Sequence, residues 1–161
     1  AWMLQICDIL TYLHGFIPPI LHRNIEPANL ILVEGKYHYS QNSFGNLKLI
    51  GFGAIKSLVL ERRDLVGSSG YADDCQLQID ATPQVDLYSL APTLAFLLTG
   101  QNPIAFCRRE GRQPYRFIAD AMPNVAEDIR AVLRRLTHLN PEHHYPSVDA
   151  LVDDLRAIAI E

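Results

Sequence analysis

The most apolar stretch of the chain runs from Val85 to Leu98, shortly before a glycine, Gly100. Its large apolar side chains are Val85, Leu87, Leu90, Leu94, Phe96, Leu97 and Leu98. A run of this length predicts a buried helix rather than a strand. Pro92 lies inside it, lacks a backbone N–H and is expected to kink the helix. Gly100 is a residue type that often ends helices.

Weaker apolar patterns predict the other elements. Apolar residues at helical spacing predict helices over 2–13, 124–136 and 148–158. Asn124 begins a capping-box pattern, and Ser147 is predicted to cap the last helix. Short apolar runs predict strands over 20–22, 30–33 and 47–50, with 34–46 as a surface connection. Segments 57–81 and 101–123 show no clear period and are expected to be loops with short helical turns. The predicted fold is mainly α, of the α+β class, with a few short strands.

The composition and charge of the chain exclude several classes of protein. The 161 residues fit one domain, and 48% hydrophobic with 20% charged residues is typical of a globular protein. A net charge of −4 argues against nucleic acid as a partner, and no apolar run is long enough to span a membrane. The N-terminus shows no signal-peptide pattern. Cys7, Cys75 and Cys107 are too scattered for a disulfide framework, so we expect reduced thiols and a cytoplasmic protein.

A polar segment follows the first predicted helix. It reads His22-Arg23-Asn24-Ile25-Glu26-Pro27-Ala28-Asn29, and Gly51-Phe52-Gly53 comes after a predicted strand. These segments resemble the catalytic loop and the metal-binding turn of protein kinases. The resemblance continues in order through 67–72, 86–100 and 140–147, and is nearest to the bacterial Hanks-type serine/threonine kinases, particularly cyanobacterial ones. It implies the C-terminal lobe of a kinase over residues 1–161, with the N-terminal lobe absent.

Three positions depart from the kinase pattern, and each departure removes or reverses a charge. Asn24 stands where the family has the catalytic Asp, and Glu26 stands where it has a Lys that contacts the transferred phosphate. Gly51 replaces the metal-binding Asp of the turn that continues with Phe52 and Gly53. The other metal ligand of the family, Asn29, is present, but one neutral amide is a poor magnesium site.

Other matching positions imply structural support. The resemblance places His22 in the core beneath the turn, and it makes Asp86 the side chain that holds the loop backbone by hydrogen bonds. Arg23 matches the family's receptor for a phosphate on the activation segment, which Ser68 or Ser69 could carry; a local carboxylate or carbonyl is the alternative partner that we prefer.

A paired departure concerns Cys75 and His144. The resemblance places at these positions a Glu and an Arg that form a buried salt bridge. Because both partners are replaced, we expect a near-neutral contact between Cys75 and His144 in place of the ion pair. A catalytic Cys–His pair is the alternative, but it lacks an evident third group.

The sequence therefore predicts an inactive kinase-like domain, a pseudokinase, that acts as a signalling scaffold or an allosteric binding module. It predicts no cofactor and a protein partner, with association through the surface that the N-terminal lobe normally covers. The alternative is an active serine/threonine kinase that uses Mg²⁺ and ATP when the N-terminal lobe is supplied. A second alternative is a fragment without independent function.

Overall fold

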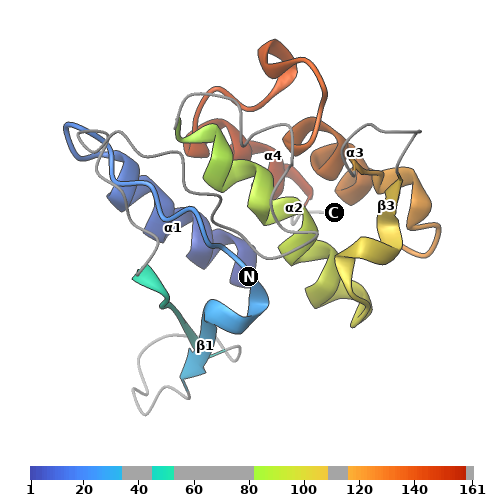
Figure 1. Ribbon diagram of the computed structural model, residues 1–161, viewed down its shortest axis with the longest axis horizontal. Helices are drawn as coiled ribbons and strands as arrows, with labels where there is room; N and C mark the ends of the chain where they lie inside the picture. The colour runs from blue at the N-terminus through green and yellow to red at the C-terminus, as the bar shows by residue number, and fades with distance from the viewer. Residues whose placement is uncertain (34–44, 53–81, 109–115, 159–161) are drawn as a thin grey trace.

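The computed structural model describes residues 1–33, 45–52, 82–108 and 116–158, and Figure 1 shows the arrangement of their elements. The α-helices among these residues are α1 (Trp2–His14), α2 (Gln84–Thr99), α3 (Glu127–Leu136) and α4 (Val148–Ile158). The strands are β1 (Leu30–Val33), β2 (Asn46–Leu49), β3 (Cys107–Arg108) and β4 (Arg116–Phe117). Short 3-10 turns cover Pro27–Asn29, Pro103–Phe106, Ala119–Ala121 and Pro141–His143. The predicted class, mainly α with a few short strands, is confirmed.

Helix α2 is the buried helix that the apolar stretch predicts. Every residue from Asp86 to Thr93 is buried, so this part of the helix has no solvent-facing side. Gly100 ends the helix with φ +67°, and its N–H donates to the carbonyl of Phe96 at 2.7 Å. Because a glycine has no Cβ, it adopts this left-handed conformation without strain.

The other helices complete the core around α2. Helix α1 packs against α4, and α2 and α4 each pack against α3. Ile6 and Leu10 of α1, Leu133 of α3 and Leu151 of α4 are fully buried. The predicted helix over 2–13 is confirmed and extends one residue further, to His14. No helix among the described residues has the length and apolarity needed to cross a membrane.

Strands β1 and β2 form an antiparallel pair in which Leu30 faces Leu49 and Val33 faces Asn46. The side chain of Gln5 in α1 fixes this pair. Its Nε2 donates to the carbonyl of Gly45 at 3.1 Å, and its Oε1 accepts from the N–H of Leu47 at 2.7 Å. The residues 22–29, named here the 22–29 loop, lie between α1 and β1 and lead directly into β1.

Two predictions of the sequence are wrong. Residues 20–22 do not form a strand, since Leu21 alone makes an isolated β-bridge. Asn124 does not cap α3: the N-cap residue is Ala126, and no side chain caps that helix end. The predicted cap at Ser147 is confirmed, because its Oγ accepts from the N–H of Ala150 at 3.3 Å.

The segment 101–123 contains the predicted helical turns and also an unpredicted pair of strands, β3 and β4, on the side of the molecule away from β1 (Figure 1). The interpretations of 34–44 and 57–81 concern residues outside the described ranges.

Candidate functional site

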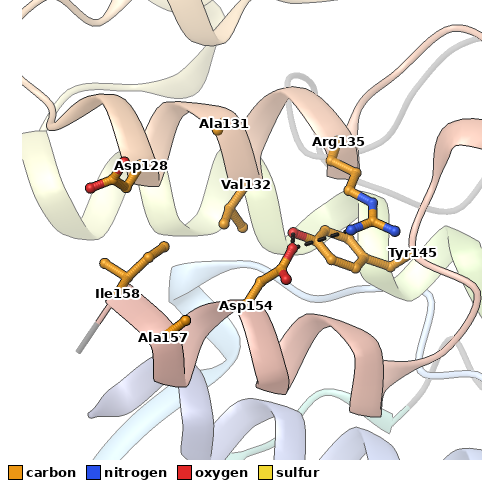
Figure 2. Close-up of a pocket in the computed structure, with 8 residues that line it drawn as sticks. All are labelled: Asp128, Ala131, Val132, Arg135, Tyr145, Asp154, Ala157 and Ile158. Atoms are coloured by element: carbon orange, nitrogen blue, oxygen red, sulfur yellow. Dashed lines mark hydrogen bonds and ion pairs between the residues drawn. The ribbon is translucent and has the colours of Figure 1, made fainter. Parts of the chain in front are cut away.

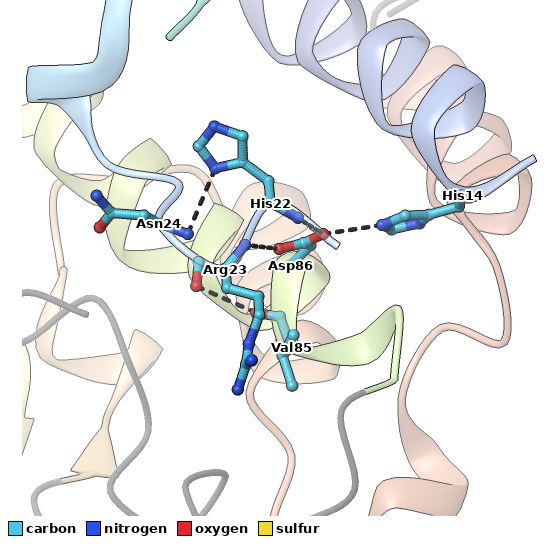
Figure 3. Close-up of polar contacts among 7 residues, drawn as sticks. His14, His22, Arg23, Asn24, Val85 and Asp86 are labelled. Carbon is cyan, nitrogen blue, oxygen red and sulfur yellow. Dashed lines mark hydrogen bonds and ion pairs between the residues drawn. The ribbon is translucent and has the colours of Figure 1, made fainter. Parts of the chain in front are cut away.

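The 22–29 loop is anchored to α2 by the carboxylate of Asp86, which is fully buried (Figure 3). Asp86 Oδ1 accepts a hydrogen bond from the backbone N–H of Arg23 at 2.6 Å. Asp86 Oδ2 accepts one from the backbone N–H of His22 at 2.9 Å. Burying a carboxylate is costly unless such bonds replace those lost to water. Helix α2 therefore determines where the first residues of the loop lie.

The same carboxylate also contacts α1. His14 Nε2 lies 2.9 Å from Asp86 Oδ2, with the His14 side chain only 9% exposed. Asp86 thus joins α1, α2 and the loop. The loop backbone here is unusual, because Arg23 has φ +63° and is the one described non-glycine residue with positive φ. A left-handed conformation costs such a residue about 1–2 kcal/mol. The bonds to Asp86 hold the backbone in it.

His22 connects the loop to the turn after β2. Its side chain is buried, its Nε2 lies 3.0 Å from the carbonyl of Ile50, and its ring meets that of Phe52 edge-on at 4.9 Å between centroids. The backbone N–H of Asn24 points to His22 Nδ1 at 3.3 Å. A neutral ring with its proton on Nε2 satisfies both contacts. Burial also lowers the pKa of His22 below its usual value, which favours this neutral form.

A second bond from α2 fixes the middle of the loop. The hydroxyl of Thr93, a fully buried residue, lies 2.7 Å from the carbonyl of Ser89 within the helix and 3.2 Å from the carbonyl of Ile25 in the loop. The Ile25 side chain is itself 1% exposed. The loop therefore meets α2 through a carboxylate at its start and a hydroxyl further along.

Asn29, at the end of the loop, turns its side chain back toward the loop. Its Nδ2 donates to the carbonyl of Asn24 at 2.8 Å and lies 3.5 Å from Glu26 Oε1, a weaker contact. Its backbone carbonyl accepts from the N–H of Ile50 at 2.8 Å. One residue thus closes the loop on itself and joins it to the segment that leads into Gly51.

The protein kinase domain family matches residues 1–155 of the chain. The chain belongs to the protein kinase family. Serine/threonine-protein kinases B and C of Synechocystis sp. are each 28% identical to it, over 168 and 163 residues and 96% of the chain. Wall-associated receptor kinase-like 1 of Arabidopsis thaliana is 32% identical over 126 residues and 74% of the chain. The chain spans 27%, 28% and 16% of the lengths of these proteins, so it matches a part of each.

Within this kinase-like domain, the residues at the metal position do not fit magnesium. Gly51 has no side chain, and Asn29 offers one neutral carboxamide, which lies against Gly51. Mg²⁺ requires near-octahedral oxygen ligands and is usually held by one or two carboxylates. The carboxylate of Glu26 lies 3.5 Å from the Asn29 nitrogen, so it faces a donor rather than the carboxamide oxygen. Among the residues that the structure describes, no three His, Cys, Asp or Glu side chains are grouped to hold a metal.

The structure brings together most of the residues that the sequence singles out. His22 and Asp86 are buried, while Asn24, Glu26 and Asn29 are partly buried around the loop. Phe52 contacts the His22 ring although it is 42% exposed. Four of the residues lie outside the described ranges: Gly53, Ser68, Ser69 and Cys75. The structure therefore does not test the phosphate partner of Arg23 or the contact between Cys75 and His144.

Two residues of the site are missing from the sequence-based set. His14 contacts Asp86, and Thr93 bonds to the loop. The signal for Thr93 is a hydroxyl one turn after Ser89 inside a mostly apolar helix, because such a group needs a partner when it is buried. For His14 the signal is weaker: the segment Tyr12-Leu13-His14 is similar to the end of the helix before the catalytic loop of kinases, but that similarity indicates no contact.

A separate pocket of about 400 Å³ lies between α3 and α4 (Figure 2). At one end Asp154 Oδ2 accepts from the Tyr145 hydroxyl at 2.7 Å and from Arg135 Nη1 at 3.2 Å. The Arg135 guanidinium stacks 4.1 Å above the centre of the Tyr145 ring. Burial, together with the bond to Asp154, raises the pKa of Tyr145 above its usual value. No residue of the 22–29 loop lines this pocket, and its polar groups at this end are bonded to one another.

Proposed function

We propose that this kinase-like domain does not transfer phosphate and that it serves in signalling as a scaffold or allosteric module for a protein partner. The observation that carries the proposal is that the 22–29 loop keeps its anchors to α2, while the reactive positions of this loop and of the turn after β2 lack the required charges. Asp86 and Thr93 bond to the loop, whereas Asn24, Glu26 and Gly51 occupy the positions of the family's base, cation and metal ligand.

The expected loss of rate is large. A carboxamide at Asn24 has no useful basicity, and loss of general base catalysis costs roughly 10²–10⁴ in rate. Glu26 places a negative charge where the family has a positive one beside a negatively charged phosphate, so its interaction is repulsive. Without a carboxylate at Gly51, the charge of the phosphates is not neutralised by a well-held metal ion. The three effects act in the same direction.

The chief alternative is an active serine/threonine kinase that uses Mg²⁺ and ATP and whose small lobe lies elsewhere. It is supported by the presence of Asn29 and by the names of the two similar Synechocystis proteins, which are serine/threonine-protein kinases. A fragment without independent function is the remaining alternative. We place the protein in the cytoplasm, where its cysteines would remain reduced.

Labelled ATP separates these alternatives. The full-length protein is incubated with γ-labelled ATP and either Mg²⁺ or Mn²⁺, beside an Asn29→Ala variant and an Asn124→Ala variant as a matched surface control. We expect no incorporation above that of the Asn29→Ala variant. Incorporation that Asn29→Ala abolishes and Asn124→Ala preserves would refute the proposal. A chain that shows no cooperative thermal unfolding would instead favour the fragment.

The proposed protein partner is expected to bind next to the loop. Apolar side chains are exposed there on β1 and on the turn after β2: Ile31 is 44% exposed, Leu32 51%, Ile50 41% and Phe52 42%. Grouped apolar side chains at a surface favour association with another protein. We expect Leu32→Asp to weaken capture of a partner from the native cell extract, and Leu139→Asp, at a residue 62% exposed on the loop before α4, to leave it unchanged. Equal capture by both variants would exclude this surface.

A further inference from the structure

The space for a side chain at position 51 is already filled. Gly51 has φ +87°, and a Cβ built on it would lie 2.5 Å from Asn29 Oδ1, 2.6 Å from Cγ and 2.8 Å from Nδ2. Real Cβ atoms essentially never approach other atoms this closely. Any residue other than glycine would therefore have to displace the whole Asn29 carboxamide.

One hydrogen bond holds this carboxamide in place, and a second holds the backbone of the same residue. Asn29 Nδ2 donates to the carbonyl of Asn24 at 2.8 Å, and the Asn29 carbonyl accepts from the N–H of Ile50 at 2.8 Å. Rotating the side chain away from Gly51 would break or weaken the first bond. A buried or partly buried carbonyl that loses its partner costs free energy, so the rotation is unfavourable.

The other glycines with positive φ among the described residues differ from Gly51. Gly100 has φ +67° and nothing within 4 Å of an added Cβ, so only its backbone conformation requires glycine. At Gly45, with φ +71°, the nearest atom is Leu32 Cδ1 at 3.0 Å, the end of a flexible and exposed side chain. Gly51 is thus the position where backbone conformation and a hydrogen-bonded polar group both exclude a side chain.

Asn29 clamps the 22–29 loop through its bond to the carbonyl of Asn24, and we propose that its carboxamide also occupies the place of a metal-binding side chain at position 51. Gly51 and Asn29 are then a coupled pair: the glycine makes room for the carboxamide, and the carboxamide orders the loop without a bound nucleotide or metal. This deepens the proposed function and rests on it, because the family holds its metal with a side chain at position 51 and the carboxamide fills that space. It also means that an Asp at position 51 would have to displace the clamp first.

A double-mutant cycle on the 161-residue chain tests the pair. Gly51→Ala is measured in the native background and in an Asn29→Ala background by urea unfolding, with Gly100→Ala as the matched control for left-handed backbone strain. Gly100→Ala is expected to raise the unfolding equilibrium constant roughly tenfold in both backgrounds. Gly51→Ala is expected to raise it roughly 100-fold or more in the native background and roughly tenfold when Asn29 is already Ala.

Equal effects of Gly51→Ala in the two backgrounds would overturn the proposal. Where Gly51→Ala leaves no folded protein, recovery of a cooperative transition in the double variant supports the coupling, and failure to recover it refutes it. A second measurement is the hydrogen exchange of the Asn29 side-chain amide by NMR, assigned by its loss in Asn29→Ala. Exchange slower than that of the exposed Asn102 amide is expected, and exchange as fast as that of Asn102 would overturn the clamp.

The two proposals fail in different ways. Phosphate transfer in the labelled-ATP assay, together with coupling between Gly51 and Asn29, would refute the proposed function and leave the contact intact. Absence of transfer together with absence of coupling would refute the clamp alone.

Discussion

Replacing Asp86 by Asn tests how the fold supports the 22–29 loop. The two carboxylate oxygens each accept a backbone N–H, from Arg23 and from His22. A carboxamide of the same shape has a single oxygen, so one of these N–H groups must face the new NH₂ group. A buried donor left without a partner costs about 1–3 kcal/mol, and bonds to a charged acceptor are at the upper end of this range. We therefore expect Asp86→Asn to lower the free energy of unfolding by about 2 kcal/mol.

Asp86→Ala is expected to be more severe. It removes both acceptors and leaves a cavity in a site that is fully buried, so a loss of about 4 kcal/mol or more is expected. Since a domain of this kind has a total stability of about 5–15 kcal/mol, this variant leaves little reserve. The isosteric Asp86→Asn variant is therefore the informative one.

The assay is urea unfolding at pH 7, followed by circular dichroism at fixed protein concentration. Asp153→Asn is the matched control, because it makes the same chemical change on the exposed side of α4 and should stay within about 0.5 kcal/mol of the native chain. If Asp86→Asn changed the stability no more than Asp153→Asn does, the carboxylate would not be what holds the loop.

Three further outcomes follow from the contacts. Burial lowers the pKa of His22 in the folded state, so below about pH 6.5 the unfolded chain binds more protons than the folded chain. The melting temperature should therefore fall from pH 7 to pH 5. The fall should be smaller in the His22→Gln variant than in the native chain. Tyr145→Phe removes the donor to Asp154 and should lower stability by about 1 kcal/mol in urea unfolding; no change would show the bond to be worth nothing net. Ser147→Ala should cost about 1 kcal/mol by the same assay, whereas Asn124→Ala should cost nothing; equal losses would contradict the observed caps.

The elements with strong apolar patterns could be predicted from the sequence. Helix α2 extends only one residue beyond the apolar stretch at each end, because a helix buried on most sides needs apolar side chains all around its axis. Helix α3 begins later than the sequence pattern predicts, for a local reason. The N–H of Val125 donates to the carbonyl of Met122 in a turn, so the chain at Asn124 is committed to that turn before the helix begins. Strands β3 and β4 are two residues each, too short to show alternation.

The sequence predicts which residues make up the candidate site better than it predicts how they contact one another. The order and spacing of the motifs point to His22, Asn29, Gly51 and Asp86. A loop of one fixed backbone shape needs particular residue types at particular positions, so its sequence shows them at a fixed spacing. The contact between Asn29 and Gly51 could not be predicted, since it depends on one backbone dihedral and one side-chain rotamer that no spacing encodes.

The atoms that hold this loop in place differ from the atoms that would take part in phosphate transfer. The loop can therefore keep its shape when the residues at the reactive positions change. The loop is held by backbone N–H groups bonded to Asp86, by a backbone carbonyl bonded to Thr93 and by the buried His22 ring. None of these bonds uses the side chain of Asn24, so an uncharged residue there leaves them unchanged. Asn29 is the exception, because its side chain closes the loop through the carbonyl of Asn24. The one metal ligand of the kinase pattern that this chain keeps is thus the one whose side chain also has a structural bond to make.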